Sequence, residues 1–150
     1  MKPETLETRL MNRIARKRSD VFLRADFEDL AGYDQVGRAL RTLTRKRELV
    51  KVGQGLYARA RTSNVNGEVV PVKGLATLNE ALQRVGVETV PTRLERAYNA
   101  GETTQVPTGR VVGVTRRVRR KIGYSDFTLS FERAAGWKGK AQGGVDRTLL

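Results

Sequence analysis

The sequence contains neither cysteine nor histidine. Without these residues the chain can form no disulfide and no Cys/His zinc site. It also lacks the commonest general base of enzymes, and it contains no P-loop and no dinucleotide-binding fingerprint. A metal-dependent nuclease would have to use Asp26, Glu28 and Asp29, which lie among many arginines on a predicted helix. We therefore expect a protein that is not an enzyme and that carries no cofactor.

Long apolar runs are missing as well. No stretch approaches the roughly 18 apolar residues of a membrane span, and the N-terminal segment MKPETLETRL has no apolar signal core. No basic helix with an aromatic-rich face is evident, which argues against a membrane surface as partner. These absences predict a cytoplasmic protein with no membrane partner.

Negative charge is scarce relative to positive charge. The chain has 29 lysines and arginines against 16 aspartates and glutamates, a formal net charge of +13. Such a charge attracts polyanions and accelerates encounter with them. Double-stranded DNA is the first candidate, and RNA and an acidic partner protein are the alternatives. RNA is ranked lower because aromatic residues are only 6% of the chain and no paired strand aromatics are evident.

Three helices followed by a hairpin are predicted in the first part of the chain. Apolar residues recur at helical spacing, and two short alternating runs flank a glycine-rich loop, Gly53-Gln54-Gly55. In this register Val52 faces Leu56 and Val50 faces Ala58, and Asp34 is the expected N-cap of the third helix. The predicted helices cover residues 3–17, 24–31 and 34–46, and the predicted strands cover residues 49–52 and 56–59.

The third helix combines an apolar stripe with a face of long hydrogen-bond donors. In a helix-turn-helix this is the helix that enters the major groove, where arginine pairs with guanine and glutamine with adenine. The hairpin would be a slim wing that reaches phosphates. The predicted DNA contacts are Gln35, Arg38, Arg41, Thr42, Arg45 and Lys46 from the helix, and Lys51, Gln54 and Arg59 from the hairpin.

The second half is predicted to be a small basic α+β module. A connector rich in glycine, proline and asparagine over 61–74 separates it from the first domain. Helices are expected over 75–85 and 92–100, and strands over 87–90, 110–114, 118–122 and 127–131, which form an antiparallel sheet. The predicted fold is thus α+β, with a winged helix-turn-helix over 1–61, the module over 62–133 and a flexible tail over 134–150.

A basic run, Thr115–Lys121, lies on or beside one of these predicted strands. Because side chains alternate along a strand, Arg116 and Arg120 are expected on one face with Val118. The other face would carry Arg117, Arg119 and Lys121. This continuous basic face is assigned to DNA phosphates, with an acidic partner protein as the alternative.

Several segments together resemble AbiEi-type antitoxins, which are transcriptional regulators of type IV toxin–antitoxin (abortive infection) systems. The most specific is the wing phrase Val50-Lys51-Val52-Gly53-Gln54-Gly55-Leu56-Tyr57. The others are Val21-Phe22, Asp26-Phe27, Val36-Gly37-Arg38-Ala39-Leu40, Val90-Pro91, Tyr98-Asn99-Ala100-Gly101 and Thr103-Thr104-Gln105-Val106-Pro107.

This likeness covers roughly residues 5–132 and implies a winged-helix domain that binds the promoter of its own operon. It also implies a second domain that assists repression, neutralises a nucleotidyltransferase-type toxin, or both. The expected function is therefore a sequence-specific DNA-binding transcriptional regulator, an antitoxin-type autorepressor. An RNA-binding accessory protein and an adaptor that docks an acidic enzyme through its basic sheet are the alternatives.

Overall fold

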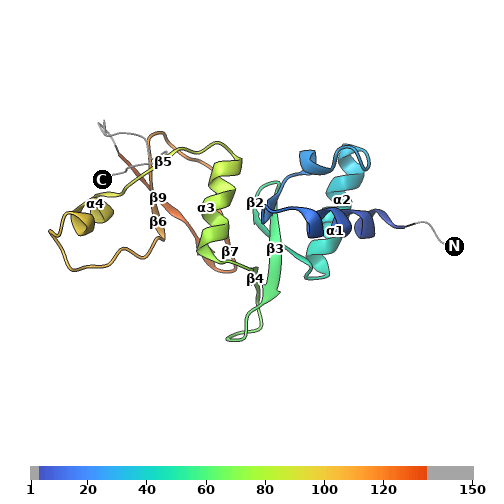
Figure 1. The fold of residues 1–150 in the computed structure, drawn as a ribbon, viewed down its shortest axis with the longest axis horizontal. Coiled ribbons are helices and arrows are strands. Elements are labelled where there is room, and N and C mark those ends of the chain that lie inside the picture. The colour runs from blue at the N-terminus through green and yellow to red at the C-terminus, as the bar shows by residue number, and fades with distance from the viewer. Residues whose placement is uncertain (1–3, 135–150) are drawn as a thin grey trace.

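Helices and short strands alternate along the chain in the computed structural model, which describes residues 4–134 (Figure 1). The α+β class predicted from the sequence is confirmed. The first half contains α1 (Leu6–Arg16), β1 (Val21–Phe22), the 3-10 turn η1 (Arg24–Phe27), α2 (Tyr33–Arg45), β2 (Leu49–Gly53) and β3 (Leu56–Thr62). The second half contains β4 (Val69–Pro71), α3 (Leu75–Arg84), β5 (Thr89–Val90), α4 (Arg93–Asn99), β6 (Val111–Val114), β7 (Gly123–Tyr124), β8 (Phe127–Thr128) and β9 (Ser130–Arg133). The tail expected over 134–150 lies outside the described residues, apart from Ala134.

The two N-terminal helices begin at different kinds of cap. Thr5 caps α1 by accepting a hydrogen bond from the backbone N–H of Thr8 at 3.2 Å. The N-cap of α2 is Gly32, and the expected cap, Asp34, lies instead in the first turn, where its carboxylate favours the positive end of the helix. The helix predicted over 24–31 is only the single turn η1, which places one fully buried apolar side chain, Phe27, in the core.

The β2–β3 hairpin has the predicted pairing of Val50 with Ala58, and Lys51 lies opposite Tyr57, but the predicted pairing of Val52 with Leu56 is wrong. Its turn is tighter than expected. A bulge at Val52 places Gly53 opposite Leu56, so only Gln54 and Gly55 remain in the turn. Gly55 has a φ of 71°, a conformation that glycine adopts without steric cost. Strand β1 pairs with the other edge of β3, which gives the strand order β1-β3-β2.

This sheet is buried on both faces. On one face, Leu49, Tyr57 and Phe22 pack against α1, η1 and α2 in one apolar core. On the other face, Val50, Val52, Leu56 and Ala58 belong to a second core that also contains Leu78, Ala81 and Leu82 of α3, together with Val112, Val114 and Ile122. The hairpin is therefore the middle layer between the two halves (Figure 1).

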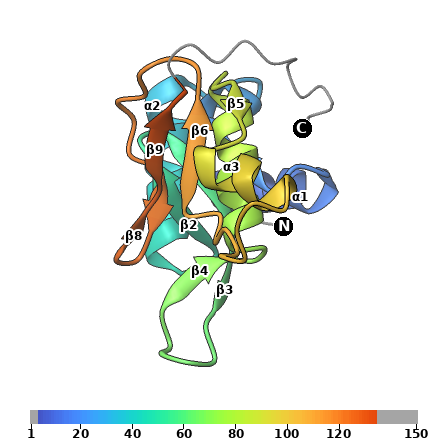
Figure 2. The same ribbon diagram turned by 90° about the vertical axis from the view of Figure 1, so that its left-hand side faces the viewer.

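Buried polar contacts reinforce the junction between the halves. The Glu80 carboxylate on α3 accepts hydrogen bonds from the backbone N–H groups of Asp20 and Val21 at 2.9 and 3.1 Å. Arg84, also on α3, forms an ion pair with Asp26 of η1 at 2.8 Å. Strand β3 runs through the boundary expected between residues 61 and 62, and the two halves share a core. The connector expected over 61–74 contains β4, which pairs with β3 to form a projecting ribbon (Figure 2).

The second half has a mixed sheet, where an antiparallel one was expected. Strand β5 pairs antiparallel with β6, but β9 pairs parallel with β6. A parallel pair needs a crossover of about a dozen residues or more, and residues 115–129 supply it. The strand predicted over 118–122 is absent, because both edges of β6 are already occupied and the chain leaves the sheet after Val114. A two-strand hairpin, β7–β8, follows instead.

Candidate nucleic-acid interface

The six DNA-contact residues predicted on α2 share one side of that helix. At about 100° per residue, Gln35, Arg38, Arg41, Thr42, Arg45 and Lys46 fall within an arc of about 140°. All are exposed except Thr42, which is half-buried. The opposite side of α2 is buried through Val36, Ala39, Leu40 and Leu43. The helix therefore docks through its apolar stripe and presents four cations to solvent.

Two polar residues of this face already have partners within the helix. The side-chain oxygen of Gln35 accepts the backbone N–H of Gly32 at 3.2 Å, which leaves the amide nitrogen of Gln35 free to donate. The Thr42 hydroxyl accepts a hydrogen bond from Arg45 at 3.1 Å. Gln35, Arg38 and Thr42 also line a shallow groove of about 570 Å³ between α2 and the start of α1.

The turn of the β2–β3 hairpin and the basic run, predicted as separate features, meet in space. Arg120 donates to the backbone carbonyl of Gln54 at 3.3 Å, and the backbone at Lys121 packs against Gly53. The two segments line a groove of about 600 Å³. Its cationic lining residues are Lys51, Arg119, Arg120 and Lys121, and Tyr124, Ser125 and Thr128 add hydroxyl groups. We call this the basic groove.

The basic run itself differs from the prediction. Because residues 115–122 form no strand, the expected face of Arg117, Arg119 and Lys121 does not exist. Arg119 and Lys121 line the basic groove together with Arg120, which was expected on the opposite face. Arg117 lines a different groove, of about 370 Å³, near the C-terminal end of α3. We therefore assign Arg117 no place in the basic groove.

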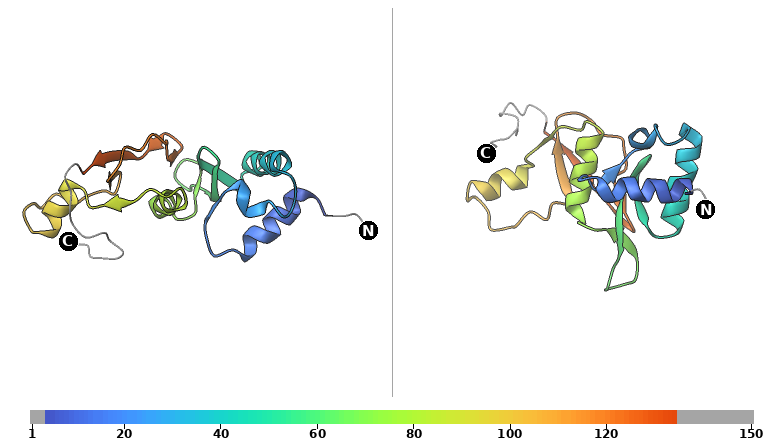
Figure 3. Two further views of the ribbon diagram at one scale, coloured as in Figure 1. Left: turned by 90° about the horizontal axis from the view of Figure 1, so that it is seen from above. Right: turned by 45° about the vertical axis from the view of Figure 1, so that its right-hand side comes forward.

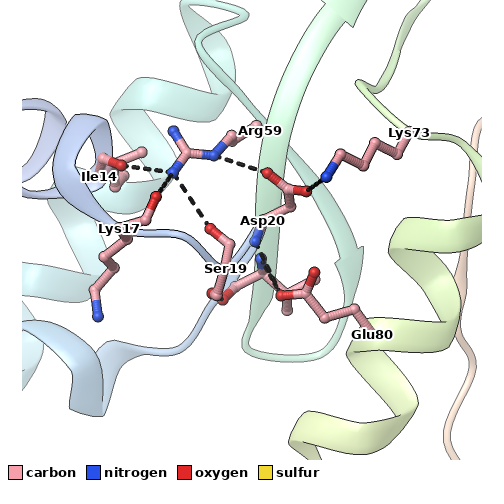
Figure 4. A network of polar contacts seen from close by, with 8 residues as sticks. Ile14, Lys17, Ser19, Asp20, Arg59, Lys73 and Glu80 are labelled. Atoms are coloured by element: carbon pink, nitrogen blue, oxygen red, sulfur yellow. Dashed lines mark hydrogen bonds and ion pairs between the residues drawn. The ribbon is translucent and has the colours of Figure 1, made fainter.

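Arg59, predicted to contact phosphate, points inward (Figure 4). Its guanidinium pairs with Asp20 at 2.9 Å and donates to the backbone carbonyls of Ile14, Lys17 and Ser19 at 2.5–3.3 Å. The Asp20 carboxylate also pairs with Lys73 at 3.0 Å. These contacts close the end of α1 onto β3, so the role of Arg59 is structural and we leave it out of the interface.

Ion pairs distinguish the cations that hold the fold together from the cations of the candidate interface. The four ion pairs in the part of the chain that the structure describes use Arg13, Arg59, Lys73 and Arg84, and each joins different elements. The Arg13–Asp29 pair, at 2.7 Å, joins α1 to the turn after η1, and the hydrogen bond from Arg13 lowers the pKa of Asp29. In contrast, no carboxylate among residues 4–134 pairs with the cations of α2 or of the basic groove.

The elements that carry the two groups of unpaired cations, α2 and the segment after β6, lie toward the same side of the molecule. Seen from above, α2 and the region of β6–β9 lie on one side, whereas α1 lies on the other (Figure 3, left). The perpendicular view agrees, with α2 and the segment after β6 on the same side (Figure 2). The basic groove is lined by the hairpin turn and by residues of the segment after β6. A polyanion longer than either element could contact both.

A protein-family model matches residues 9–148 of the chain. The matching family is DUF6088, described as a family of unknown function. The chain belongs to the DUF6088 family. No curated protein and no solved structure matches it. Since the family carries no known activity, the relation to AbiEi-type antitoxins stays a prediction.

The DUF6088 chain shows no metal site within residues 4–134, where no group of three or more acidic side chains is placed to hold an ion. No helix in the same range is long and apolar enough to cross a membrane.

Sequence reasoning missed one residue beside α2, Arg24. Arg24 of η1 places its guanidinium 4.2 Å from the centre of the Tyr33 ring, at the start of α2. It also lies against α2 at Gly37. A glycine in the middle of an amphipathic helix was the available signal, because such a glycine often marks a close approach.

Proposed function

We propose that this DUF6088 protein is a sequence-specific, double-stranded DNA-binding transcriptional regulator. The observation that carries the proposal is that the cations of α2 and of the basic groove have no carboxylate partner among residues 4–134, while the elements that carry them lie toward one side of the molecule. Cationic side chains that pair with no carboxylate keep their full charge to replace the counterions of a phosphate backbone.

The order of elements supports a winged helix-turn-helix. Helix α1, the single turn η1 and α2 are followed by a hairpin, and β1 completes a small sheet in the order β1-β3-β2. In this interpretation α2 is the recognition helix, and its exposed arc faces base edges in the major groove. The hairpin would not act as a free wing, because its sheet is buried on both faces. Its turn would contribute one wall of the basic groove.

The basic groove suits the DNA backbone that flanks the contacted bases. Lys51, Arg119 and Lys121 offer ammonium and guanidinium donors, and Arg120 is held to the hairpin turn by the Gln54 carbonyl. Such contacts position a protein on the duplex without reading sequence. Specificity would then come from α2, and a large part of the affinity from the groove.

An RNA-binding function is less well supported. RNA-recognition sheets display adjacent aromatic rings on which bases stack. The two exposed tyrosines of the described residues, Tyr33 and Tyr98, lie on α2 and α4, at opposite ends of the molecule (Figure 1). No stacking platform is formed by this pair.

The proposal is tested by binding to duplex DNA taken from upstream of the protein's own gene. Replacing Arg38 or Arg41 with alanine should weaken specific binding by about 1–3 kcal/mol, with a smaller effect on random duplex. Arg93→Ala is the matched control, because Arg93 is exposed on α4, far from α2. Equal losses on every sequence would make Arg38 and Arg41 phosphate contacts and refute the base-reading role.

As a second candidate, we propose that the end of the molecule at α4 docks a partner protein, such as the toxin implied by the AbiEi resemblance. Of the six exposed large hydrophobic side chains in the described range, Tyr98, Val106 and Val111 line one groove of about 640 Å³. Under this candidate, Val106→Asp abolishes neutralisation of a toxin encoded in the same operon and leaves DNA binding intact. Normal neutralisation by Val106→Asp would exclude this groove.

A further inference from the structure

Arg24 is held against the recognition helix by two contacts. The guanidinium carbon lies 4.2 Å from the centre of the Tyr33 ring, within the range of a cation–π interaction. The guanidinium also lies across the backbone of α2, so that a Cβ on Gly37 would come within 2.5 Å of its carbon. These two contacts hold the guanidinium plane of Arg24, while the edge of the guanidinium, which carries the N–H donors, remains available.

The donors of Arg24 have no protein partner among the described residues. No hydrogen bond or ion pair to its guanidinium occurs there, although the side chain is half-buried. The other half-buried arginines of this half, Arg13 and Arg59, both pair with a carboxylate and also donate to backbone carbonyls. An arginine whose side chain is ordered by packing, and whose donors have no partner in the protein, is available to bind an acceptor of another molecule.

Gly37 provides the space that this placement needs. Glycine in a helix interior is less favourable than alanine. Gly37 is buried and its neighbour in the interior is the Arg24 guanidinium. Tyr33, Gly37 and Arg41 follow each other at intervals of four residues on one row of α2. Arg24 therefore extends the cationic arc of α2 past Arg41.

We propose that Arg24 is a phosphate clamp, which binds a phosphodiester of duplex DNA at the edge of the major groove occupied by α2. The inference rests on the proposed function. In a helix-turn-helix, the element before the recognition helix crosses the backbone, and η1 holds that position. Arginine is suited to phosphate because its planar fork donates two parallel hydrogen bonds. Stacking on Tyr33, which is 70% exposed, sets the plane of this fork at the protein surface.

The decisive variant is Gly37→Ala, which should separate stability from binding. The added methyl group displaces the flexible end of Arg24 and leaves the backbone of α2 in place. Thermal unfolding should be unchanged or shifted upward, because alanine favours the helix. Affinity for duplex DNA should fall roughly three- to tenfold near physiological salt, and the slope of log affinity against log salt should fall by about one.

Arg24→Gln provides the second variant and should cause the same losses on the upstream duplex and on random duplex. The double variant Arg24→Gln/Gly37→Ala should bind no more weakly than Arg24→Gln alone, because both changes remove one contact. A normal salt slope in Arg24→Gln would overturn the clamp, as would a loss confined to the upstream sequence, which indicates a base contact. If Arg41→Ala weakens binding and Arg24→Gln does not, the clamp fails and the proposed function stands. If the wild-type protein binds no duplex DNA, both the clamp and the proposed function are overturned.

Discussion

Replacing Arg59 with alanine tests whether this residue is structural. The guanidinium is 25% exposed and joins Asp20 to the carbonyls of three residues at the end of α1. Its removal leaves the Asp20 side chain, which is 11% exposed, with Lys73 as its remaining ion-pair partner. The backbone carbonyls lose their donor at the same time.

The size of the effect follows from this partial burial. Removing one partner of a fully buried ion pair costs about 3–5 kcal/mol. Water can reach part of this site and Lys73 retains its pairing with Asp20, so we expect a loss of about 2–3 kcal/mol. In a chain of this length, that corresponds to a fall in Tm of roughly 4–12 °C.

Chemical denaturation measures the free energy of unfolding, and DNA binding is then measured at a temperature where the variant is fully folded. The stability should fall, while the affinity for duplex DNA and its salt slope should match those of the wild type. Arg61→Ala, on the exposed part of the same strand, is the control and should change neither quantity. Unchanged stability together with a reduced salt slope would refute the structural role and restore Arg59 to the interface.

Three further perturbations test the fold. Leu82→Ala, at a fully buried position of the shared core, should cost about 2–5 kcal/mol and keep one unfolding transition by all probes, whereas two transitions would show independent halves. Gly113→Ala should destabilise strongly, because its Cβ would lie 2.3 Å from the carbonyl oxygen of Val90, and wild-type stability in urea would contradict this. Arg13 lowers the pKa of Asp29. The contribution of this pair to the stability of the fold is therefore complete above the ordinary aspartate pKa of about 3.9, and it is lost as the pH falls through the lowered value. The stability difference between wild type and Asp29→Asn should therefore vanish in acid, and a difference independent of pH would exclude the ion pair as its source.

The local elements were largely predictable from the sequence. Helical periodicity located α1, α2, α3 and α4, and alternation around Gly53–Gly55 gave the pairing of Val50 with Ala58. These features depend on neighbours in the chain, which a pattern records directly. The six α2 residues lie on one exposed arc for the same reason, although their contact with DNA stays a prediction.

The long-range features were not predictable from these patterns. Arg59 pairs with Asp20, which lies far from it in the sequence, and nothing in the spacing of either residue predicts this pair. The alternation of the basic run is typical of a strand, but the edges of β6 were already taken by β5 and β9. Strand β4 was missed because it is short, ends in a proline and lies in a loop-like composition. Only the fold shows that the basic run meets the hairpin turn.

The central claim is that α2 and the basic groove bind duplex DNA in a sequence-specific manner. The most direct measurement compares binding of the full chain to its own upstream duplex, to a random duplex and to single-stranded RNA, at several salt concentrations around the physiological value. Our account predicts the tightest binding to the upstream duplex, weaker and more salt-dependent binding to the random duplex, and the weakest binding to RNA. Tighter binding to RNA than to either duplex would contradict it.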